Sequence, residues 1–297
     1  MALIDAVPYL RCPVCRQPLA GAGTALRCPG RHCFDIARQG YVDLTGGRLT
    51  HPGDSAGMVA ARAGFLATGG YDFISAALAA ATPDRSGLVV DVGGGTGYHL
   101  ARVLDALPAA TGLVVDLAKP ALRRAARAHP RAAAVRADTW RQLPLADRAA
   151  TVLLDVFAPR HGAEFHRVLA PGGVLLVVTP TPDHLADLAD LLGDVDGVRV
   201  LQVDPGKPER TAATLTPHFH LVDERVHTHR LTLTRTHVRT LVGMTPSAAH
   251  TDPAALSRAV AGLPEPLPVT AAVRLARYRP RAGQVERSIS SQPRGGS

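Results

Sequence analysis

The sequence contains no long apolar segment, and its N-terminus lacks a basic region followed by an apolar core. No run of 18 or more apolar residues occurs in the 297, so neither a membrane-spanning helix nor a signal peptide is predicted. We therefore expect a cytoplasmic protein without a membrane partner. The hydrophobic content of 46% and the charged content of 20% are typical of globular proteins, and the length suffices for one sizeable domain and a small one.

Cysteine is also scarce: the chain has four, all between positions 12 and 33. In a chain expected to be cytoplasmic, such clustering indicates a metal site rather than disulfides. Two short ligand pairs, C-P-V-C and C-P-G-R-H, supply three thiolates and one imidazole, the closed tetrahedral set of a structural Zn²⁺. The predicted ligands are Cys12, Cys15, Cys28 and His32. Cys33 is the weaker candidate because adjacent residues rarely point at one ion, and the alternative is a set of free buried cysteines.

Residues 88–100 contain a strand-loop-helix pattern. A β-branched and apolar run ends in Asp91, a glycine-dense turn follows, and a helical pattern begins at Tyr98. This is where an α/β sheet binds a nucleotide-like ligand. Glycines at 93, 95 and 97 let the chain turn sharply and a ligand approach closely. A dinucleotide fingerprint starting at position 93 would need glycine where Tyr98 stands. A plain glycine-rich turn is the alternative.

The order of residues in this turn is D-x-G-x-G-x-G, which resembles motif I of class I S-adenosylmethionine-dependent methyltransferases. The resemblance implies an α/β, Rossmann-like methyltransferase fold with S-adenosylmethionine as the methyl donor. The donor contacts that it places within the motif include Asp91, Gly93 and Gly97.

Residues 86–180 alternate strand and helix patterns in the manner of a doubly wound parallel sheet. The second strand ends at Asp116, where a carboxylate can accept both ribose hydroxyls of an adenosyl group. The alternative for Asp116 is the N-cap of a helix over residues 119–129. The third strand, over residues 132–137, is followed by Asp138, at a place where methyltransferases commonly have an acid that binds the adenine amino group. A solvated turn residue is the alternative there.

These patterns divide the chain into regions. Residues 1–47 are expected to form the zinc knuckle, with short strands over residues 34–44 packed on it, and the Gly- and Pro-containing residues 45–53 form a linker. Residues 54–279 are expected to form the methyltransferase domain. Residues 280–297, rich in Ser, Gln, Gly, Arg and Pro, are expected to be a disordered basic tail.

The last third of the chain gives weaker patterns. Residues 219–226 and 231–234 alternate well enough for an antiparallel strand pair, and residues 269–278 for a last strand. Five histidines fall in or near these segments, at positions 218, 220, 227, 229 and 237. No cysteine or acid pattern joins them, so solvated strand residues are favoured over a second metal site.

Further motifs lie between the cysteines and motif I. Residues 40–44 (Gly-Tyr-Val-Asp-Leu), residues 53–56 (Gly-Asp-Ser-Ala), Ala61-Arg62 and Phe65-Leu66 complete the pattern. This combination resembles the 23S rRNA guanine-N1 methyltransferase family, and within it the macrolide-resistance branch of the tylosin type. The resemblance extends over roughly residues 8–275.

That resemblance implies methylation of N1 of a guanine in a hairpin loop of 23S rRNA. The loop lines the tunnel at which macrolides bind, so the methyl group is expected to confer tylosin-type resistance. The resemblance also implies further donor contacts, which fall on Tyr71, Gly95, Thr96 and His184. From the residues alone, Tyr71 would be a core aromatic at a helix start and His184 a helix-terminal histidine.

N1 of guanine carries a proton that must leave, so an acceptor near it helps the reaction. Asp155, at the end of the fourth predicted strand, is the acid that the sequence places best, because chemistry in such sheets occurs beyond the carboxyl ends of the strands. Its loop, Asp-Val-Phe-Ala-Pro, differs from the Asn/Asp-Pro-Pro-Tyr loop of many amino methyltransferases.

The formal net charge of +8 favours a polyanionic partner, here a 23S rRNA hairpin. A small-molecule methyltransferase is the alternative function, although it needs neither the knuckle nor the charge. A third hypothesis is a zinc-ribbon RNA-binding protein with a degenerate methyltransferase fold, and the intact glycines and Asp116 count against it. The sequence leaves a homodimer open.

Overall fold

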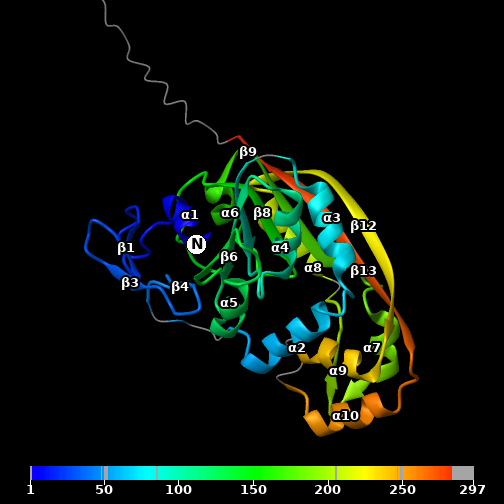
Figure 1. Cartoon of the computed structure of the whole chain (residues 1–297). Helices are drawn as coiled ribbons and strands as arrows, with labels where there is room; N and C mark the ends of the chain where they lie inside the picture. Colours follow the sequence, from blue (N-terminus) through cyan, green and yellow to red (C-terminus); the bar gives the residue numbers. More distant parts are fainter. Residues whose placement is uncertain are drawn as a thin grey trace, which may run out of the picture.

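The computed structural model describes residues 2–47, 49, 53–84, 86–204, 206–245, 247 and 250–282. The predicted tail therefore lies outside the described residues from position 283 onward. Among the described residues, no helix is long and apolar enough to cross a lipid bilayer. The chain is built around one eight-stranded sheet, flanked by helices on both faces (Figure 1).

The strand order in this sheet is β12-β13-β9-β8-β5-β6-β7-β4. In that order the strands are β12 (Phe219–Leu233), β13 (Leu267–Pro280), β9 (Leu169–Pro180), β8 (Ala150–Val156), β5 (Gly87–Val92), β6 (Ala110–Asp116), β7 (Ala132–Arg136) and β4 (Val42–Asp43). The strands from β9 to β4 pair in parallel, whereas β13 runs antiparallel to both of its neighbours. β5, β6 and β8 are buried on both faces, which explains the apolar runs that lead to Asp91, Asp116 and Asp155 in their sequences. The predicted α/β class is confirmed.

Seven helices cover one face of the sheet in the described part of the chain. They are α2 (Ala56–Leu66), α3 (Asp72–Ala81), α4 (Tyr98–Ala106), α5 (Lys119–Ala125), α7 (Ala186–Leu192), α9 (Arg235–Gly243) and α10 (Pro253–Ala261). Ser55 caps α2, because its hydroxyl oxygen accepts the N–H of Met58 at 3.2 Å. α5 ends at Ala125, four residues before the predicted end, and turns follow it.

The opposite face of the sheet is covered by α6 (Gly162–Val168), by α8 (Lys207–Leu215) and by the N-terminal segment. Residues 137–149, which cross from β7 to β8, form no helix. The space is filled by α1 (Ala2–Ala6) and the 3-10 helix η1 (Val7–Tyr9), and α1 contacts β6 and β7. The N-terminal segment therefore completes the layer that covers this face of the sheet (Figure 1).

The cysteine-containing segment forms its own three-stranded sheet of β1 (Ala20–Ala22), β2 (Ala25–Arg27) and β3 (Cys33–Asp35). A two-residue hairpin elsewhere pairs β10 (Asp194–Val195) with β11 (Val198–Arg199). The segment is held against the β7-to-β8 crossover by the Arg16 guanidinium, which donates to the carbonyls of Leu143 and Leu145 at 2.9 Å each.

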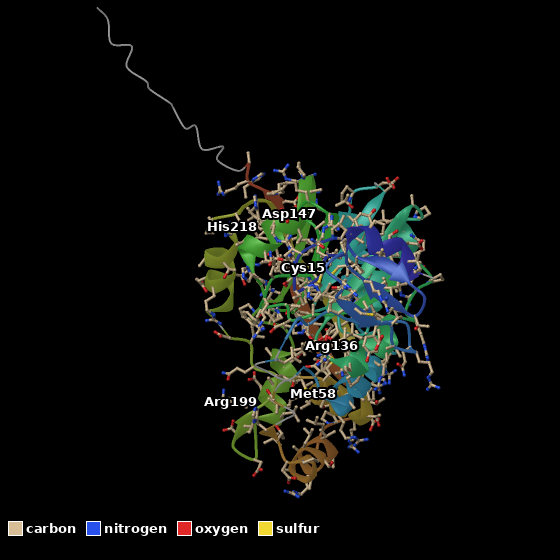
Figure 2. All side chains as sticks on the ribbon, turned by 90° about the vertical axis from the view of Figure 1, so that its left-hand side faces the viewer. Cys15, Met58, Arg136, Asp147, Arg199 and His218 are labelled. Carbon is tan, nitrogen blue, oxygen red and sulfur yellow. The ribbon has the colours of Figure 1, made fainter. Side chains whose placement is uncertain are left out.

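The prediction that residues 34–44 pack as strands on the knuckle is only half right. β3 joins the knuckle, but β4 pairs in parallel with β7, and Arg136 binds Asp43 at 2.8 Å. Figure 2 shows this side of the molecule, with Arg136 between Cys15 above and Met58 below. A strand of two residues gives no periodicity from which its partner could be inferred. The division of the chain at residue 47 stays a prediction, since this region shares a strand and a core with the large sheet.

The predicted pairing of residues 219–226 with 231–234 is wrong. These residues form one continuous strand, β12, whose antiparallel partner is β13. The four intervening residues, His-Thr-His-Arg, contain no glycine or proline that could turn the chain. β12 is an edge strand that is exposed over most of its length. Polar residues can therefore interrupt the alternation of apolar and polar side chains without ending the strand. The predicted last strand is confirmed as part of β13.

Truncating Leu10 to alanine tests whether the N-terminal segment belongs to the core of the sheet. Leu10 is fully buried in the cluster that includes Leu88, Val90 and Leu113, so Leu10→Ala should lower the free energy of unfolding by about 2–5 kcal/mol. Urea titrations followed by circular dichroism measure this loss. Val14→Ala, at an exposed position of the knuckle, is the control and should change stability by under about 0.5 kcal/mol. An unchanged midpoint in Leu10→Ala would show that the segment is an independent unit.

Candidate functional site

Three cysteines and one histidine of the knuckle converge on a single point. The side-chain ligand atoms of Cys12, Cys15, Cys28 and His32 all lie within 4.8 Å of one another. Cys28 Sγ lies 3.3 Å from His32 Nδ1, and Cys15 Sγ lies 3.5 Å from Cys28 Sγ. Around a tetrahedral Zn²⁺, neighbouring ligand atoms stand about 3.6 Å (S to N) and about 3.8 Å (S to S) apart. The four side chains fit a structural zinc ion, as predicted.

The turn before His32 shapes this cluster. A Cβ on Gly30 would lie 3.3 Å from Cys15 Sγ, so the glycine lets the turn approach the ligand atoms. Cys33 is exposed and stands outside the cluster, where its Sγ accepts a hydrogen bond from Arg27 Nε at 3.4 Å. The preference for His32 over Cys33 is confirmed.

The glycine-rich loop joins the carboxyl end of β5 to α4. Gly93, Gly95 and Gly97 have φ values of +68°, +56° and +76°, which favour glycine. A Cβ on Gly93 would lie 2.7 Å from the Cβ of Ala158 in the loop after β8, so the two loops touch. Thr96 is buried in the same turn. The predicted strand, loop and helix are confirmed.

Asp116, at the end of β6, is bonded to this loop. One carboxylate oxygen accepts the N–H of Gly95 at 2.9 Å, and the other accepts the N–H of Ala118 at 2.8 Å. The N-cap of α5 is Ala118, so Asp116 does not cap that helix. Burial raises the pKa of Asp116, and the two N–H donors oppose that shift. These two hydrogen bonds fix the carboxylate beside the glycine-rich turn.

Asp91 is a buried acid at the base of the loop. It is 1% exposed, and neither carboxylate oxygen has a hydrogen-bond partner among the described residues. Burial, together with the nearby charges of Asp116 and Asp155, raises the pKa of Asp91 to about 8. A buried carboxylate of this kind is stabilised by a cationic ligand, and S-adenosylmethionine carries a sulfonium and an ammonium. The site therefore fits the donor that the motif implies.

Two further groups border the loop. The guanidinium of Arg62, on α2, forms an ion pair with Asp54 and would lie 3.5 Å from a Cβ on Gly95. Its second nitrogen donates to the carbonyl of Met244 at 3.2 Å. Asp138 lies one residue beyond Ala137, whose N–H bonds to the carbonyl of Asp116. The Asp138 carboxylate binds Arg141 at 3.4 Å and accepts the N–H of Trp140 at 3.0 Å, so it is anchored rather than solvated.

Tyr71 and His184 are joined in a buried aromatic cluster. The N–H of Ala272 donates to His184 Nδ1 at 3.2 Å, which assigns the ring proton to Nε2. Nε2–H then donates to the Tyr71 hydroxyl at 3.0 Å, so the hydroxyl directs its own proton away from His184. Burial raises the pKa of Tyr71 and keeps the phenol protonated. Phe157 contacts both rings, at 6.2 and 5.8 Å between centroids, and links the cluster to the loop after β8.

Asp155, at the end of β8, is fully buried in an ion pair. Its carboxylate lies 3.0 Å from Nη2 of Arg160, whose side chain is 8% exposed. Between them the chain turns sharply, because Phe157 has a φ of +57°. The guanidinium stabilises the charged carboxylate next to Asp91.

The structure thus brings most of the predicted donor residues to the carboxyl ends of β5, β6 and β8. Phe157 also borders this edge, as the sequence predicts from its place after the fourth strand, whereas Arg62 and Arg160 were missed as site residues. Arg62 stands in a motif that the sequence singles out, but its proximity to Gly95 follows only from the packing of α2. The five histidines of the C-terminal part form no metal cluster within the described residues; His229, for instance, stacks on Phe73 at 5.3 Å.

Removing one zinc ligand should unfold the knuckle and expose the sheet face that it covers. Cys12→Ala is expected to lower zinc content from about one ion per chain to none. A loss of about 3–5 kcal/mol would lower the melting temperature by about 10 °C in a chain of this size. Atomic emission and scanning calorimetry measure both quantities. Cys33→Ser is the matched control and should retain zinc; loss of zinc there would show that the ligand set is wrong.

Replacing Asp91 by asparagine should stabilise the donor-free protein at high pH. Between about pH 4 and pH 8 the folded chain holds a proton on Asp91 that the unfolded chain has released, so stability falls as pH rises through this window. The gain in melting temperature of Asp91→Asn over the wild type should therefore grow from pH 4 to pH 8 and then level off. Donor affinity should fall in the same variant. A pH-independent difference in melting temperature would contradict the assignment.

Comparison with known proteins gives two matches to family models. Residues 10–45 match the N-terminal zinc ribbon of RlmA, and residues 89–173 match a methyltransferase domain. The first range contains the four zinc ligands, and the second contains motif I, Asp116, Asp138 and Asp155. A methyltransferase domain of this kind uses S-adenosylmethionine, in agreement with the fit of the donor site.

Whole-chain relatives cover both regions. A protein of Micromonospora griseorubida assigned as a 23S rRNA (guanine-N1)-methyltransferase is 58% identical, over 93% of this chain and 99% of its own length. The 23S rRNA (guanine(748)-N1)-methyltransferase of Streptomyces fradiae is 47% identical, over 93% of this chain and 98% of its own length. A Bacillus subtilis protein assigned to the same activity is 34% identical, over 61% of this chain and 68% of its own. The chain belongs to the 23S rRNA (guanine-N1)-methyltransferase family.

Proposed function

We propose that the protein transfers the methyl group of S-adenosylmethionine to N1 of a guanine in a hairpin loop of 23S rRNA. The observation that carries the proposal is the 47% identity to the Streptomyces fradiae enzyme, which extends over 98% of that enzyme and both regions of this chain. The name of that enzyme suggests guanine 748 as the target. The net charge of +8 supports a nucleic-acid substrate.

The residues around the glycine-rich loop can hold the donor in a defined orientation. Asp91 would bind the cationic end of the molecule, Asp116 the ribose hydroxyls, and Asp138 the adenine amino group. The backbone of Gly93, Gly95, Thr96 and Gly97 would contact the donor across a surface free of Cβ atoms, and Tyr71, fixed by His184, would donate its hydroxyl proton to it. The donor supplies an electrophilic methyl carbon, so the protein contributes mainly alignment.

The acceptor nitrogen lies on the base-pairing edge of guanine, so the base must be unpaired or flipped out before it reacts. We assign removal of the N1 proton to Asp155, whose negative charge is maintained by Arg160 at 3.0 Å. The contact between Ala158 and Gly93 places the loop after β8 beside the donor loop. Asp155, at the end of β8 just before this loop, would therefore stand near both substrates.

Methylation of N1 removes a hydrogen-bonding edge and adds bulk at the drug-binding tunnel. We therefore propose that the modification confers resistance to macrolides of the tylosin type, and that the protein acts in the cytoplasm, where ribosomes assemble.

Primer extension on 23S rRNA tests the activity and the target together. A methyl group on N1 blocks Watson–Crick pairing, so reverse transcriptase should stop one nucleotide before the modified guanine in rRNA from cells that carry the gene. RNA from cells expressing the Gly95→Asp variant should give no stop. Donor-dependent methylation of small molecules with no transfer to rRNA would overturn the proposal.

The role of Asp155 is tested by Asp155→Asn, which should lower kcat by about 10²–10⁴-fold while donor affinity stays within about twofold. The double variant Asp155→Asn/Arg160→Gln removes both charges, guards against misfolding from an unpaired buried arginine, and should be equally inactive. Asp147→Asn disrupts an exposed ion pair with Arg167 and is the control. Near-wild-type turnover of the double variant would show that Asp155 only anchors Arg160.

A further inference from the structure

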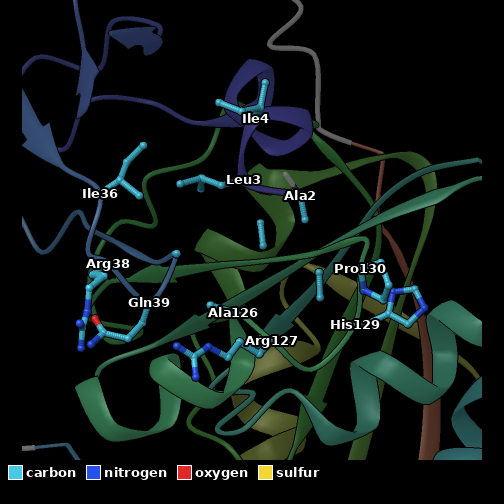
Figure 3. A pocket seen from close by; sticks show the side chains of 13 residues that line it. Ala2, Leu3, Ile4, Ile36, Arg38, Gln39, Ala126, Arg127, His129 and Pro130 are labelled. Carbon is cyan, nitrogen blue, oxygen red and sulfur yellow. The ribbon is translucent and has the colours of Figure 1, made fainter. Parts of the chain in front are cut away.

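A groove of about 450 Å³ lies between the N-terminal segment and the end of α5. Figure 3 shows Leu3 and Ile4 of α1 and Ile36 on one side of it, and the side chains of Arg38 and Arg127 on the other. The complete lining is Ala2, Leu3, Ile4, Ile36, Arg38, Gln39, Gly40, Ala126, Arg127, His129, Pro130, Ala132 and Ala133. One wall is thus apolar and the other cationic.

The apolar wall is open to solvent at Ile4 and partly at Ile36, whereas Leu3 is 6% exposed. Ile4 is 49% exposed and is one of the few large apolar side chains so exposed in the described part of the chain. Its neighbours Leu3 and Ile36 line the same groove. Exposed aliphatic surface that is rimmed by polar groups is typical of a binding site.

The cationic wall has no acid to neutralise it. None of the lining residues carries a carboxylate, and Arg38 and Arg127 form no ion pair with any described residue. Two further exposed cations without an ion pair in the described chain, Arg123 and Arg124, precede Arg127. Near the groove, His129 meets Asp105 at 3.4 Å, and two exposed acids, Asp5 and Asp35, adjoin Ile4 and Ile36 in the sequence; the four arginines outnumber these three acids. The field at the groove is therefore positive and attracts a polyanion.

We propose that this groove binds an unpaired nucleotide of the rRNA substrate, at a position other than the methylated guanine. The base lies against Leu3, Ile4 and Ile36, and its flanking phosphates lie at Arg38 and Arg127. Proteins recognise RNA mainly through unpaired loop nucleotides, whose bases pack on side chains while cations hold the backbone. The proposal rests on the proposed function, because it presupposes an rRNA hairpin as the substrate.

The location of the groove separates it from the chemistry. His129, Pro130, Ala132 and Ala133 stand at the beginning of β7, whereas Asp138 follows the end of that strand. A strand of this length spans about 16 Å, so one nucleotide cannot occupy the groove and the donor site at once. The groove contributes to the affinity and register of the RNA, and its loss should raise KM with little effect on kcat.

The test compares two double charge reversals in the full-length protein. Arg38→Glu/Arg127→Glu changes the groove, and Arg239→Glu/Arg258→Glu makes the same change of net charge on α9 and α10, at exposed arginines without an ion pair among the described residues. Binding of a 23S rRNA hairpin is measured by fluorescence anisotropy over a range of salt concentrations. Affinity for S-adenosylhomocysteine and the melting temperature are measured alongside.

We expect the groove variant to bind the hairpin at least about tenfold more weakly, and the control variant about twofold. The slope of log K against log salt should fall by about 1.4 in magnitude in the groove variant, as for two lost phosphate contacts to single-stranded RNA. Ile4→Ala, which changes no charge, should weaken binding about fivefold. All three proteins should bind S-adenosylhomocysteine as the wild type does.

Equal RNA affinities of the two double variants would overturn the groove assignment, as would an unchanged affinity in Ile4→Ala. That failure differs from failure of the proposed function. If the wild type methylates the hairpin and the groove variant matches the control, only the groove proposal is wrong. If the wild type binds donor but does not methylate the hairpin, the substrate itself is wrong.

Discussion

The structure depends on burial of one face of the sheet by the N-terminal segment. In the β7-to-β8 crossover no helix covers this face, and Leu10, Leu143 and Leu145 fill the place of one. The segment that supplies Leu10 has too little apolar surface to be stable by itself, so the zinc ion and the core stabilise each other. The zinc site therefore has a role different from that of the donor loop, but the segment that holds the zinc ion shares a core with the large sheet.

At the carboxyl edge of the sheet the dominant physical constraint is repulsion among acids. Asp91, Asp116 and Asp155 end three adjacent strands, and burial makes their charges costly. Two of them are compensated inside the protein: Asp116 by backbone N–H groups, Asp155 by Arg160. Asp91 remains without a partner among the described residues. A cationic ligand relieves that cost, which couples donor binding to the stability of the empty site.

A feature of this structure could be predicted from the sequence where it depends on residues that are close together in the chain. The zinc ligands and the glycine-rich turn are set by neighbouring residues, so spacing alone predicted their geometry. The pairings of β4 with β7 and of β12 with β13 join segments far apart in the chain, and no local pattern encodes them. Arg62 was missed for the same reason, because its place beside Gly95 follows from the packing of α2.

The two ends of β7 suggest why the zinc-containing segment and the methyltransferase fold occur in one chain. The donor residues lie beyond the carboxyl end of the strand, while α1 and residues 36–40 border its beginning. Since β4 pairs in parallel with β7, the segment has a fixed position along the strand that leads to Asp138. An RNA loop held by the segment is thereby positioned relative to the methyl donor by the sheet itself. If the proposed function holds, the zinc ion would act on the reaction through this fixed position of the segment along β7.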